Sequence, residues 1–268
     1  MSEKILEIKD ERLSFFTPAG EVKALNGVSF SMNQGDVLGI VGESGSGKSV
    51  TAYSIMGLTA YPGRLVGGTV WFNGHQIDKM TEKEFRKIRG NEVSIIFQDP
   101  MTALNPVMTV GSQIAESIQL HQNVDAKEAM EKAKEMLRTV GISDSRAGDY
   151  PHQFSGGMKQ RVGIARSYCI EPKVLLMDEP FGALDAQTRY LMQQELDRIW
   201  QTDRRTIVFV TNNIEEALYL ADRIVVISNC PATVKKEYVI DMPRPRNYVS
   251  PEFLALRKEI TSIVDKTM

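Results

Sequence analysis

The sequence has few cysteines, no long apolar run and no excess of charge of either sign. Its two cysteines, Cys169 and Cys230, form no CxxC pair in 268 residues, which predicts reduced thiols in a cytosolic protein. No apolar run approaches the length that spans a bilayer, and the first residues are too charged for a signal peptide. Any role at a membrane is therefore expected to come through a partner.

The overall balance of charge is ordinary for a globular protein. The formal net charge is −2, a quarter of the residues are charged, and no basic block stands out. We therefore expect no nucleic-acid partner. A length of 268 residues is near the upper limit for one hydrophobic core, so we expect one domain with an inserted subdomain.

The stretch Gly42–Ser49 fits the pattern G-x-x-x-x-G-K-[ST] of a phosphate-binding loop. It follows the apolar run 37–41 and precedes a helix-compatible run, 50–58, as that loop requires. Lys48 is expected to reach the β- and γ-phosphates, and the Ser49 hydroxyl to ligate Mg²⁺. The remaining cradle residues, which let backbone N–H groups point at an anion, are Gly42, Ser44, Gly45 and Gly47. The chain is predicted to bind a nucleoside triphosphate.

The first forty residues alternate short apolar segments with turn signals. Residues 28–32 and 37–41 flank Asn33-Gln34-Gly35-Asp36, which predicts a β-hairpin. A second hairpin is expected at 68–74, where Asn-Gly supplies a tight turn. A charged helix and a strand should follow; their expected ranges are 81–89 and 92–97.

From about residue 99 to 166 the pattern is helical. Asp125 with Glu128 predicts a capping box, apolar residues follow at helical spacing as a packing stripe, and Gly141 can end that helix. Strands and helices then alternate, which predicts a parallel sheet covered on both faces. Strands are expected at 174–177, 206–210 and 224–228, and helices at 186–201 and 214–221. A Pro-rich segment, 242–246, is expected to separate off a helical tail, 251–266.

Two further motifs define the chemistry. The strand 174–177 ends in two acids; Asp178 suits Mg²⁺ through water, and Glu179 suits a base that orients attacking water. About twenty residues earlier, Phe154-Ser155-Gly156-Gly157-Met158 opens a helix and offers a second phosphate-binding terminus. This run, after Tyr150-Pro151-His152-Gln153, resembles the Leu-Ser-Gly-Gly-Gln signature of ATP-binding cassette (ABC) proteins, with Ser155, Gly156 and Gly157 as its contacts.

The resemblance covers about residues 5–230. It implies a P-loop NTPase α/β core of mostly parallel sheet with an antiparallel β subdomain and an inserted α-helical subdomain. The implied division is a core of 1–97 and 167–230, a helical signature subdomain of 98–166, and a tail of 231–268. It also implies that Gln98 senses the metal and the γ-phosphate, that Asp185 in the loop 182–185 meets the partner protomer, and that Phe16, or alternatively Phe15, stacks on adenine.

One position departs from the family. The family usually has a histidine after the strand that ends at Thr211, whereas this chain has Asn212. An amide can donate a hydrogen bond to a γ-phosphate, but it is shorter and carries neither a proton nor a positive charge. We therefore expect ATP binding and dimer closure to persist and hydrolysis at this loop to be slow; the alternative is that Asn212 is tolerated without effect.

The resemblance implies a transport ATPase that uses ATP and Mg²⁺ and works at the cytoplasmic face of the membrane. Its expected partners are a second nucleotide-binding subunit, identical or related, membrane permease subunits, and an extracytoplasmic solute-binding protein. The segments 41–45 and 98–106 resemble dipeptide, oligopeptide and nickel importers. The segments 177–189 and 215–223 and the tail 243–254 resemble nitrate, sulfonate and taurine importers. Peptide import is favoured, because the resemblance implies that the segment just after Gln98 lines the groove that receives the membrane subunit. A cassette that binds ATP structurally while its partner hydrolyses is the other alternative.

Overall fold

The computed structural model describes residues 4–98, 104–182 and 184–265. The chain divides into two compact units. The first unit consists of Met1–Arg86 and Arg204–Met268, and the second of Lys87–Asp203. The predicted division at residues 98 and 166 stays a prediction.

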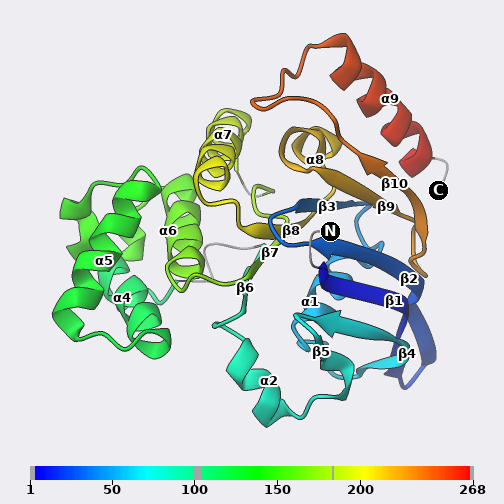
Figure 1. The fold of residues 1–268 in the computed structure, drawn as a ribbon, viewed down its shortest axis with the longest axis horizontal. Helices are drawn as coiled ribbons and strands as arrows, with labels where there is room; N and C mark the ends of the chain where they lie inside the picture. Colours follow the sequence, from blue (N-terminus) through cyan, green and yellow to red (C-terminus); the bar gives the residue numbers. More distant parts are fainter. Residues whose placement is uncertain (1–3, 99–103, 183, 266–268) are drawn as a thin grey trace. The chain divides into compact units, whose positions relative to one another are not determined.

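An antiparallel sheet forms one layer of the first unit (Figure 1). Its strands are β1 (Lys4–Thr17), β2 (Gly20–Asn33), β4 (Gly63–Phe72) and β5 (His75–Gln76), in the order β2-β1-β4-β5. The predicted hairpin at 68–74 is confirmed as β4–β5. Its turn places Asn73 and Gly74 at φ 47° and 79°, the positive values that an Asn-Gly type I′ turn needs.

The second layer of this unit contains the parallel strands. It comprises β3 (Val37–Val41), β8 (Thr206–Thr211), β9 (Arg223–Ile227) and β10 (Val234–Val239). β3 lies between β8 and β9 and is parallel to both, whereas β10 runs antiparallel to β9. All residues of β3 and β8 are buried, as expected for strands covered on both faces.

The expected hairpin between residues 28–32 and 37–41 is wrong. β2 pairs with β1 in the antiparallel sheet, whereas β3 pairs with β8 and β9 in the other sheet. The turn between them leads from one sheet to the other, and Gly35 N–H donates to Thr206 Oγ1 at 3.0 Å. The continuous apolar run of β3 is the signature of a buried parallel strand, not of a half-exposed hairpin.

The helices of the first unit are α1 (Lys48–Ile55), α8 (Ile214–Leu220) and α9 (Pro251–Asp265), with a short 3₁₀ turn at Ile77–Lys79. α2 (Glu82–Ile88) includes the boundary between the units. α9 packs through Phe253 and Ile260, both fully buried. The Pro-rich segment before it is more than a separator, because buried Arg246 donates to the Leu218 and Ala221 carbonyls at the C-terminal end of α8. A cation there satisfies carbonyls that the helix leaves unpaired.

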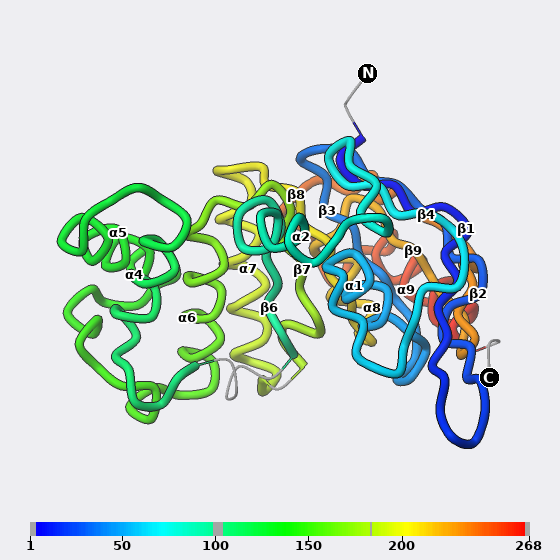
Figure 2. Tube along the Cα trace, turned by 90° about the horizontal axis from the view of Figure 1, so that it is seen from below, coloured from blue at the N-terminus to red at the C-terminus, as the bar shows by residue number. Residues whose placement is uncertain are grey.

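The second unit holds the helices drawn in green in Figures 1 and 2, with two parallel strands. Its strands are β6 (Val93–Ile96) and β7 (Val174–Asp178), paired in parallel register. Its helices are α4 (Val110–His121), α5 (Ala126–Thr139), α6 (Gly156–Tyr168) and α7 (Ala186–Asp203), with 3₁₀ turns at Asp144–Gly148 and Pro151–Gln153.

Local signals located α5 correctly. Asp125 caps the helix by accepting from Glu128 N–H at 2.8 Å, and the Glu128 carboxylate pairs with Lys132. Gly141 follows the last turn at φ 71°, and the Ile142 N–H donates back to Leu137 O at 2.8 Å. The two cysteines are free thiols, Cys169 buried and Cys230 exposed. No helix in the described part of the chain is long and apolar enough to cross a bilayer.

Candidate nucleotide-binding site

The loop 42–47 joins the buried strand β3 to α1, as the phosphate-loop pattern predicts. Gly45 and Gly47 have φ values of 77° and 94°, which residues with a Cβ adopt only with strain. Ser44 and Gly45 are exposed at the tip of the loop, and Gly47 is the N-cap of α1. The exposed tip and the N-terminus of α1 are positions where backbone N–H groups suit an anion.

Two glycines of the loop are needed because neighbouring atoms leave no room for a side chain. A Cβ on Gly42 would lie 2.9 Å from Ile227 Cγ1, and one on Gly47 would lie 3.2 Å from the Ala24 carbonyl oxygen. The loop is therefore seated directly on β2 and on the end of β9. Sequence reasoning identified the glycines but not these neighbours.

The Lys48 side chain is buried and folds back toward the start of its own loop. Its Nζ donates to the Gly42 and Glu43 carbonyls at 3.0 and 2.6 Å. The Ser46 hydroxyl is buried, and its Oγ has no hydrogen-bond partner among the residues that the structure describes. A buried ammonium and a buried unsatisfied hydroxyl beneath open N–H groups suit a phosphate ligand.

Asn212 follows β8 at the edge of the sheet where the phosphate loop follows β3. Val41 and Thr211 are register partners on these parallel strands, so Gly42 and Asn212 are the next residues on each. The Asn212 side chain is exposed, whereas Asn213 caps α8 by accepting from the N–H groups of Glu215 and Glu216. This location suits the predicted γ-phosphate contact of Asn212, which stays a prediction.

Phe16 lies on β1, 42% exposed, with the Arg64 guanidinium 5.7 Å from the centre of its ring. Its neighbour Phe15 is half-buried, and a Cβ on Gly63 would lie 2.8 Å from Phe15 Cε1. Phe15 therefore packs against the backbone of β4, whereas Phe16 presents a ring to solvent. Phe16 is thus the more exposed of the two predicted adenine contacts, and the stacking itself stays a prediction.

In the second unit the predicted carboxylates lie at the end of β7. Asp178 is its last residue and is buried, and Glu179 follows at φ 42°, a strained value for a residue with a side chain. Gln98, just beyond β6, donates through Nε2 to Glu179 Oε2 at 2.9 Å. The parallel register of β6 and β7 thus brings together two of the predicted catalytic side chains.

The predicted signature residues open α6. Ser155 is the N-cap and accepts from Met158 N–H at 3.3 Å, and Ser155 and Gly156 are exposed. A Cβ on Gly157 would lie 2.5 Å from Thr188 Cγ2 of α7, so this glycine is required by packing. The site keeps a hydroxyl and open N–H groups at a helix N-terminus.

Two arginines that sequence reasoning missed hold these loops in place. Arg146 donates to Gln153 O at 3.0 Å and stacks over the Phe154 ring at 4.2 Å, immediately before Ser155. Arg189 donates to the carbonyl of Phe181, just before the predicted partner-contact loop 182–185, and to that of Leu184 within it. Residue 183 of that loop, and 99–103 of the segment expected to meet the membrane subunit, lie outside the described residues.

Asp185 ends the partner-contact loop and accepts from Thr188 N–H at 3.0 Å at the start of α7. This hydrogen bond lowers the pKa of Asp185 below its ordinary value, because it stabilises the ionised carboxylate. The side chain is exposed. Its contact with a second protomer stays a prediction.

Ser49 and Asp178 carry oxygen donors of the kind that Mg²⁺ prefers. Among the described residues, no group of three or more His, Cys, Asp or Glu side chains could hold a metal ion. Mg²⁺ commonly binds through one or two protein oxygens together with substrate phosphates and water. Ser49 at the start of α1 provides a hydroxyl of that kind beside the phosphate loop.

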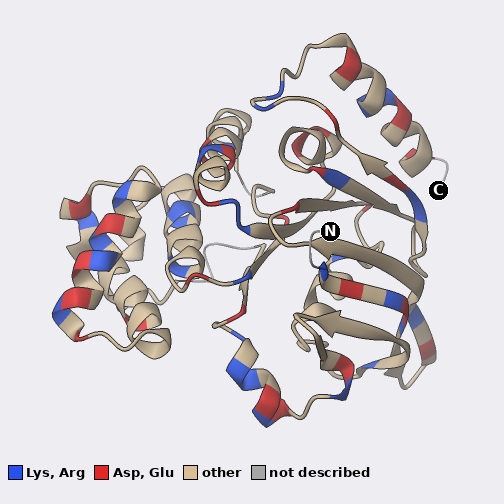
Figure 3. Cartoon of the chain, viewed as in Figure 1, with Lys and Arg blue, Asp and Glu red and all other residues tan. Residues whose placement is uncertain are grey.

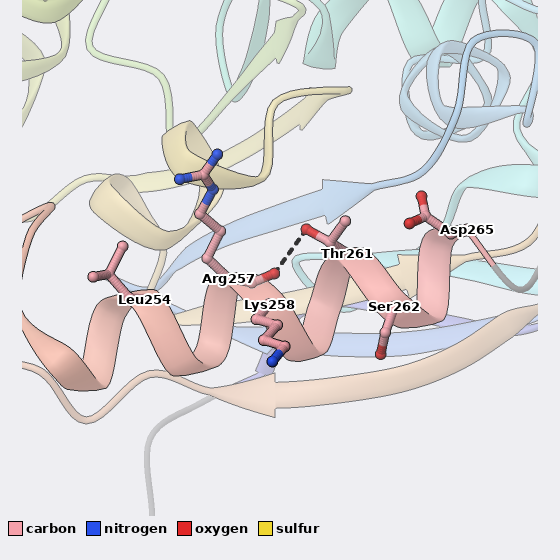
Figure 4. A pocket seen from close by; sticks show the side chains of 6 residues that line it. All are labelled: Leu254, Arg257, Lys258, Thr261, Ser262 and Asp265. Atoms are coloured by element: carbon pink, nitrogen blue, oxygen red, sulfur yellow. Dashed lines mark hydrogen bonds between the residues drawn. The ribbon is translucent and has the colours of Figure 1, made fainter.

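Two cavities lie away from these residues. One of about 390 Å³ is lined by six residues that all come from α9, so it is open on its other sides (Figure 4). The other, of about 700 Å³, lies among α5, α6 and α7, where Arg138 pairs with Asp144 and Arg198 with Glu195. Charged residues of both signs are interspersed along α5 (Figure 3). Neither cavity contains a predicted site residue.

Comparison with known proteins gives the family. Residues 25–182, more than half of the chain, match the family model described as ABC transporter. The chain is 42% identical over 228 residues to the oligopeptide transport ATP-binding protein OppD of Escherichia coli, covering 84% of this chain and 67% of that protein. It is 44% identical over 232 residues to the dipeptide transport ATP-binding protein DppD of Lactococcus lactis, covering 84% and 65%. The chain thus spans about two thirds of the length of these relatives.

The similarity to solved structures supports the same family. The chain matches a dimeric, post-hydrolysis structure of the ATP-binding cassette MJ0796 bound to ADP and phosphate, with a TM-score of 0.78 and 26% identity, covering 89% of this chain and all of that one. The predicted fold class, with its antiparallel β subdomain and mostly parallel sheet, is confirmed. The chain belongs to the ABC transporter family of ATP-binding proteins.

Proposed function

We propose that this chain is the ATP-hydrolysing subunit of an importer for peptides of the dipeptide or oligopeptide class. The observation that carries the substrate class is the 42–44% identity to oligopeptide and dipeptide transport proteins, which extends over 84% of this chain. The N-terminal resemblance seen in 98–106 favours the same class.

Each unit supplies a distinct part of the chemistry. In the first, the loop Gly42–Ser49 holds the phosphates, Phe16 stacks on adenine, and Asn212 reaches the γ-phosphate. In the second, Glu179 orients water, Asp178 and Gln98 serve the metal, and Ser155–Gly157 completes the ATP site of a second protomer, which Asp185 contacts. Bound Mg²⁺ neutralises charge on the β- and γ-phosphates.

The proposed partners follow from that cycle. Two cassettes, identical or related, close around ATP and open after hydrolysis, and permease subunits convert this movement into alternating access. The chain is held at the cytoplasmic face of the membrane by those subunits, and a solute-binding protein delivers the peptide outside.

Uptake of labelled substrates tests the proposal. Cells that carry the transporter should lose uptake of a labelled dipeptide and a labelled tetrapeptide when Lys48 is replaced by alanine, since the phosphate loop then lacks its cation. Taurine and nitrate uptake should be unchanged. Loss of taurine or nitrate uptake with peptide uptake intact would replace this proposal by the nitrate and sulfonate class.

A second function is favoured by Asn212. Its location next to the phosphate loop, where the family usually has histidine, supports a cassette that binds ATP but turns it over slowly. Asn212→His in the assembled transporter should then raise ATP turnover without tightening ATP binding. An ordinary wild-type rate that the substitution leaves unchanged would contradict slow turnover.

A further inference from the structure

The segment from Asn229 to Thr233, between β9 and β10, lies beside the phosphate loop. Ala232 is fastened to β2 by two backbone hydrogen bonds of 2.8 Å, from its own N–H to Ala24 O and from Asn26 N–H to its carbonyl. A Cβ on Gly47 would lie 3.3 Å from the Ala232 Cβ. The segment therefore lies beside Gly47 of the loop and is itself held in place by β2.

One side chain of this segment reaches the loop. Asn229 Nδ2 donates to Glu43 Oε2 at 2.8 Å. The backbone carbonyl of the same Glu43 accepts from Lys48 Nζ at 2.6 Å. Glu43 is thus bound from both sides, through its carboxylate by Asn229 and through its carbonyl by the lysine that the phosphates would engage.

We propose that Asn229 is a positioning residue that clamps Glu43 and so keeps the phosphate loop in its ATP-binding conformation; this inference rests on the proposed ATP site at Gly42–Ser49. The loop tip at Ser44 and Gly45 is exposed and has little packing of its own. Hydrogen bonds to a carboxylate are the stronger kind, and the amide of Asn229 supplies one at Glu43, immediately before the exposed tip.

The hydrogen bond from Asn229 to Glu43 acts mainly on the affinity of the loop for ATP. When phosphates arrive, the Lys48 ammonium exchanges a carbonyl of the loop for phosphate oxygens, and a loop already held at Glu43 loses less conformational freedom in that exchange. The Asn229 amide binds Glu43, which is not among the residues predicted to activate water. Its removal should raise the KM for ATP and leave kcat largely intact.

Exchange of the two partners provides the test, by calorimetric titration of the purified full chain with Mg·ATP. Asn229→Ala removes the donor and should weaken binding about 3- to 10-fold, the effect of one lost intramolecular hydrogen bond. Asn229→Asp opposes two carboxylates and should weaken it further. The double variant Glu43→Gln with Asn229→Asp restores a hydrogen bond with donor and acceptor exchanged. It also carries the same net charge as the wild type, so it should recover most of the affinity.

A matched control separates the clamp from added charge. Asn123→Asp places the same new charge on an exposed residue of the other unit and should bind Mg·ATP as the wild type does. Thermal unfolding of each variant reports whether the fold is kept. The clamp would be overturned if Asn229→Asp bound Mg·ATP with wild-type affinity. It would also be overturned if a folded Asn229→Asp chain lost affinity and the double variant did not recover it. A wild-type chain that binds no Mg·ATP would overturn the proposed function itself.

Discussion

Replacing Glu11 by glutamine should stabilise the protein at pH 8 and have little effect at pH 4.5. Glu11 lies on β1, fully buried, and neither carboxylate oxygen has a hydrogen-bond partner among the described residues. The nearby Ser54 hydroxyl donates to Thr51 O at 2.8 Å, so its proton is already engaged. Burial, with a smaller contribution from the Asp78 carboxylate and against the opposing effect of Ser54, raises the pKa of Glu11 from 4.5 to about 7.

The sign and size of the effect follow from linkage. The folded state holds the Glu11 proton more tightly than the unfolded chain does, so the stabilising contribution is complete below pH 4.5 and is lost as the pH rises to about 7. A shift from 4.5 to about 7 at about 1.4 kcal/mol per pH unit corresponds to a loss on the order of 3 kcal/mol. Glutamine has nearly the same shape and does not titrate.

Urea unfolding of both proteins between pH 4.5 and pH 8 measures this difference. Glu7→Gln is the matched control on the same strand, because ion pairs with Lys4 and Lys9 lower the pKa of Glu7. Its effect should be small and of the opposite sign. A wild-type minus Glu11→Gln difference that stays constant across this pH range would refute the reasoning.

Two further substitutions probe local structure. Asp125→Ala removes the N-cap of α5 and should lower the free energy of unfolding by about 1 kcal/mol. Urea unfolding measures this loss, with Asp144→Ala as a comparison outside that cap. An unchanged unfolding midpoint would mean that the cap contributes nothing. Arg146→Ala removes the hydrogen bond to Gln153 O and the stacking on Phe154 that precede Ser155. It should lower ATP turnover of the assembled transporter while Mg·ATP affinity of the purified chain is kept, and a parallel loss of affinity would contradict a role confined to the signature loop.

Features that depend on neighbours in sequence were predictable. The glycines of the phosphate loop, the Asp125 cap and the Asn73-Gly74 turn are each determined by backbone conformation within a few residues. The pairing of β3 was not, because strand partners are distant in sequence and the turn at Gly35 suits a hairpin as well as a passage between sheets. The buried apolar run of β3 was the available signal.

Long-range contacts of polar side chains could not be predicted either. Arg246 follows proline in a segment that reads as a linker, yet it binds carbonyls of α8 more than twenty residues earlier in the chain. Asn229 meets Glu43 across 186 positions of sequence. Glu11 sits in a charged stretch that suggests exposure, and only the fold shows that it is buried. Nothing in the residue types marks these three positions.

The Mg·ATP dissociation constant of the Lys48→Ala chain, compared with that of the wild type, tests the central claim most directly. Lys48 is buried beneath the loop, and its ammonium is the cation that the proposed site offers to the phosphates. Hydrogen bonds to charged groups contribute roughly 1.5–3 kcal/mol, so the substitution should weaken binding by about 10- to 100-fold in a chain that stays folded. Equal affinity in the two proteins would place the nucleotide somewhere other than Gly42–Ser49.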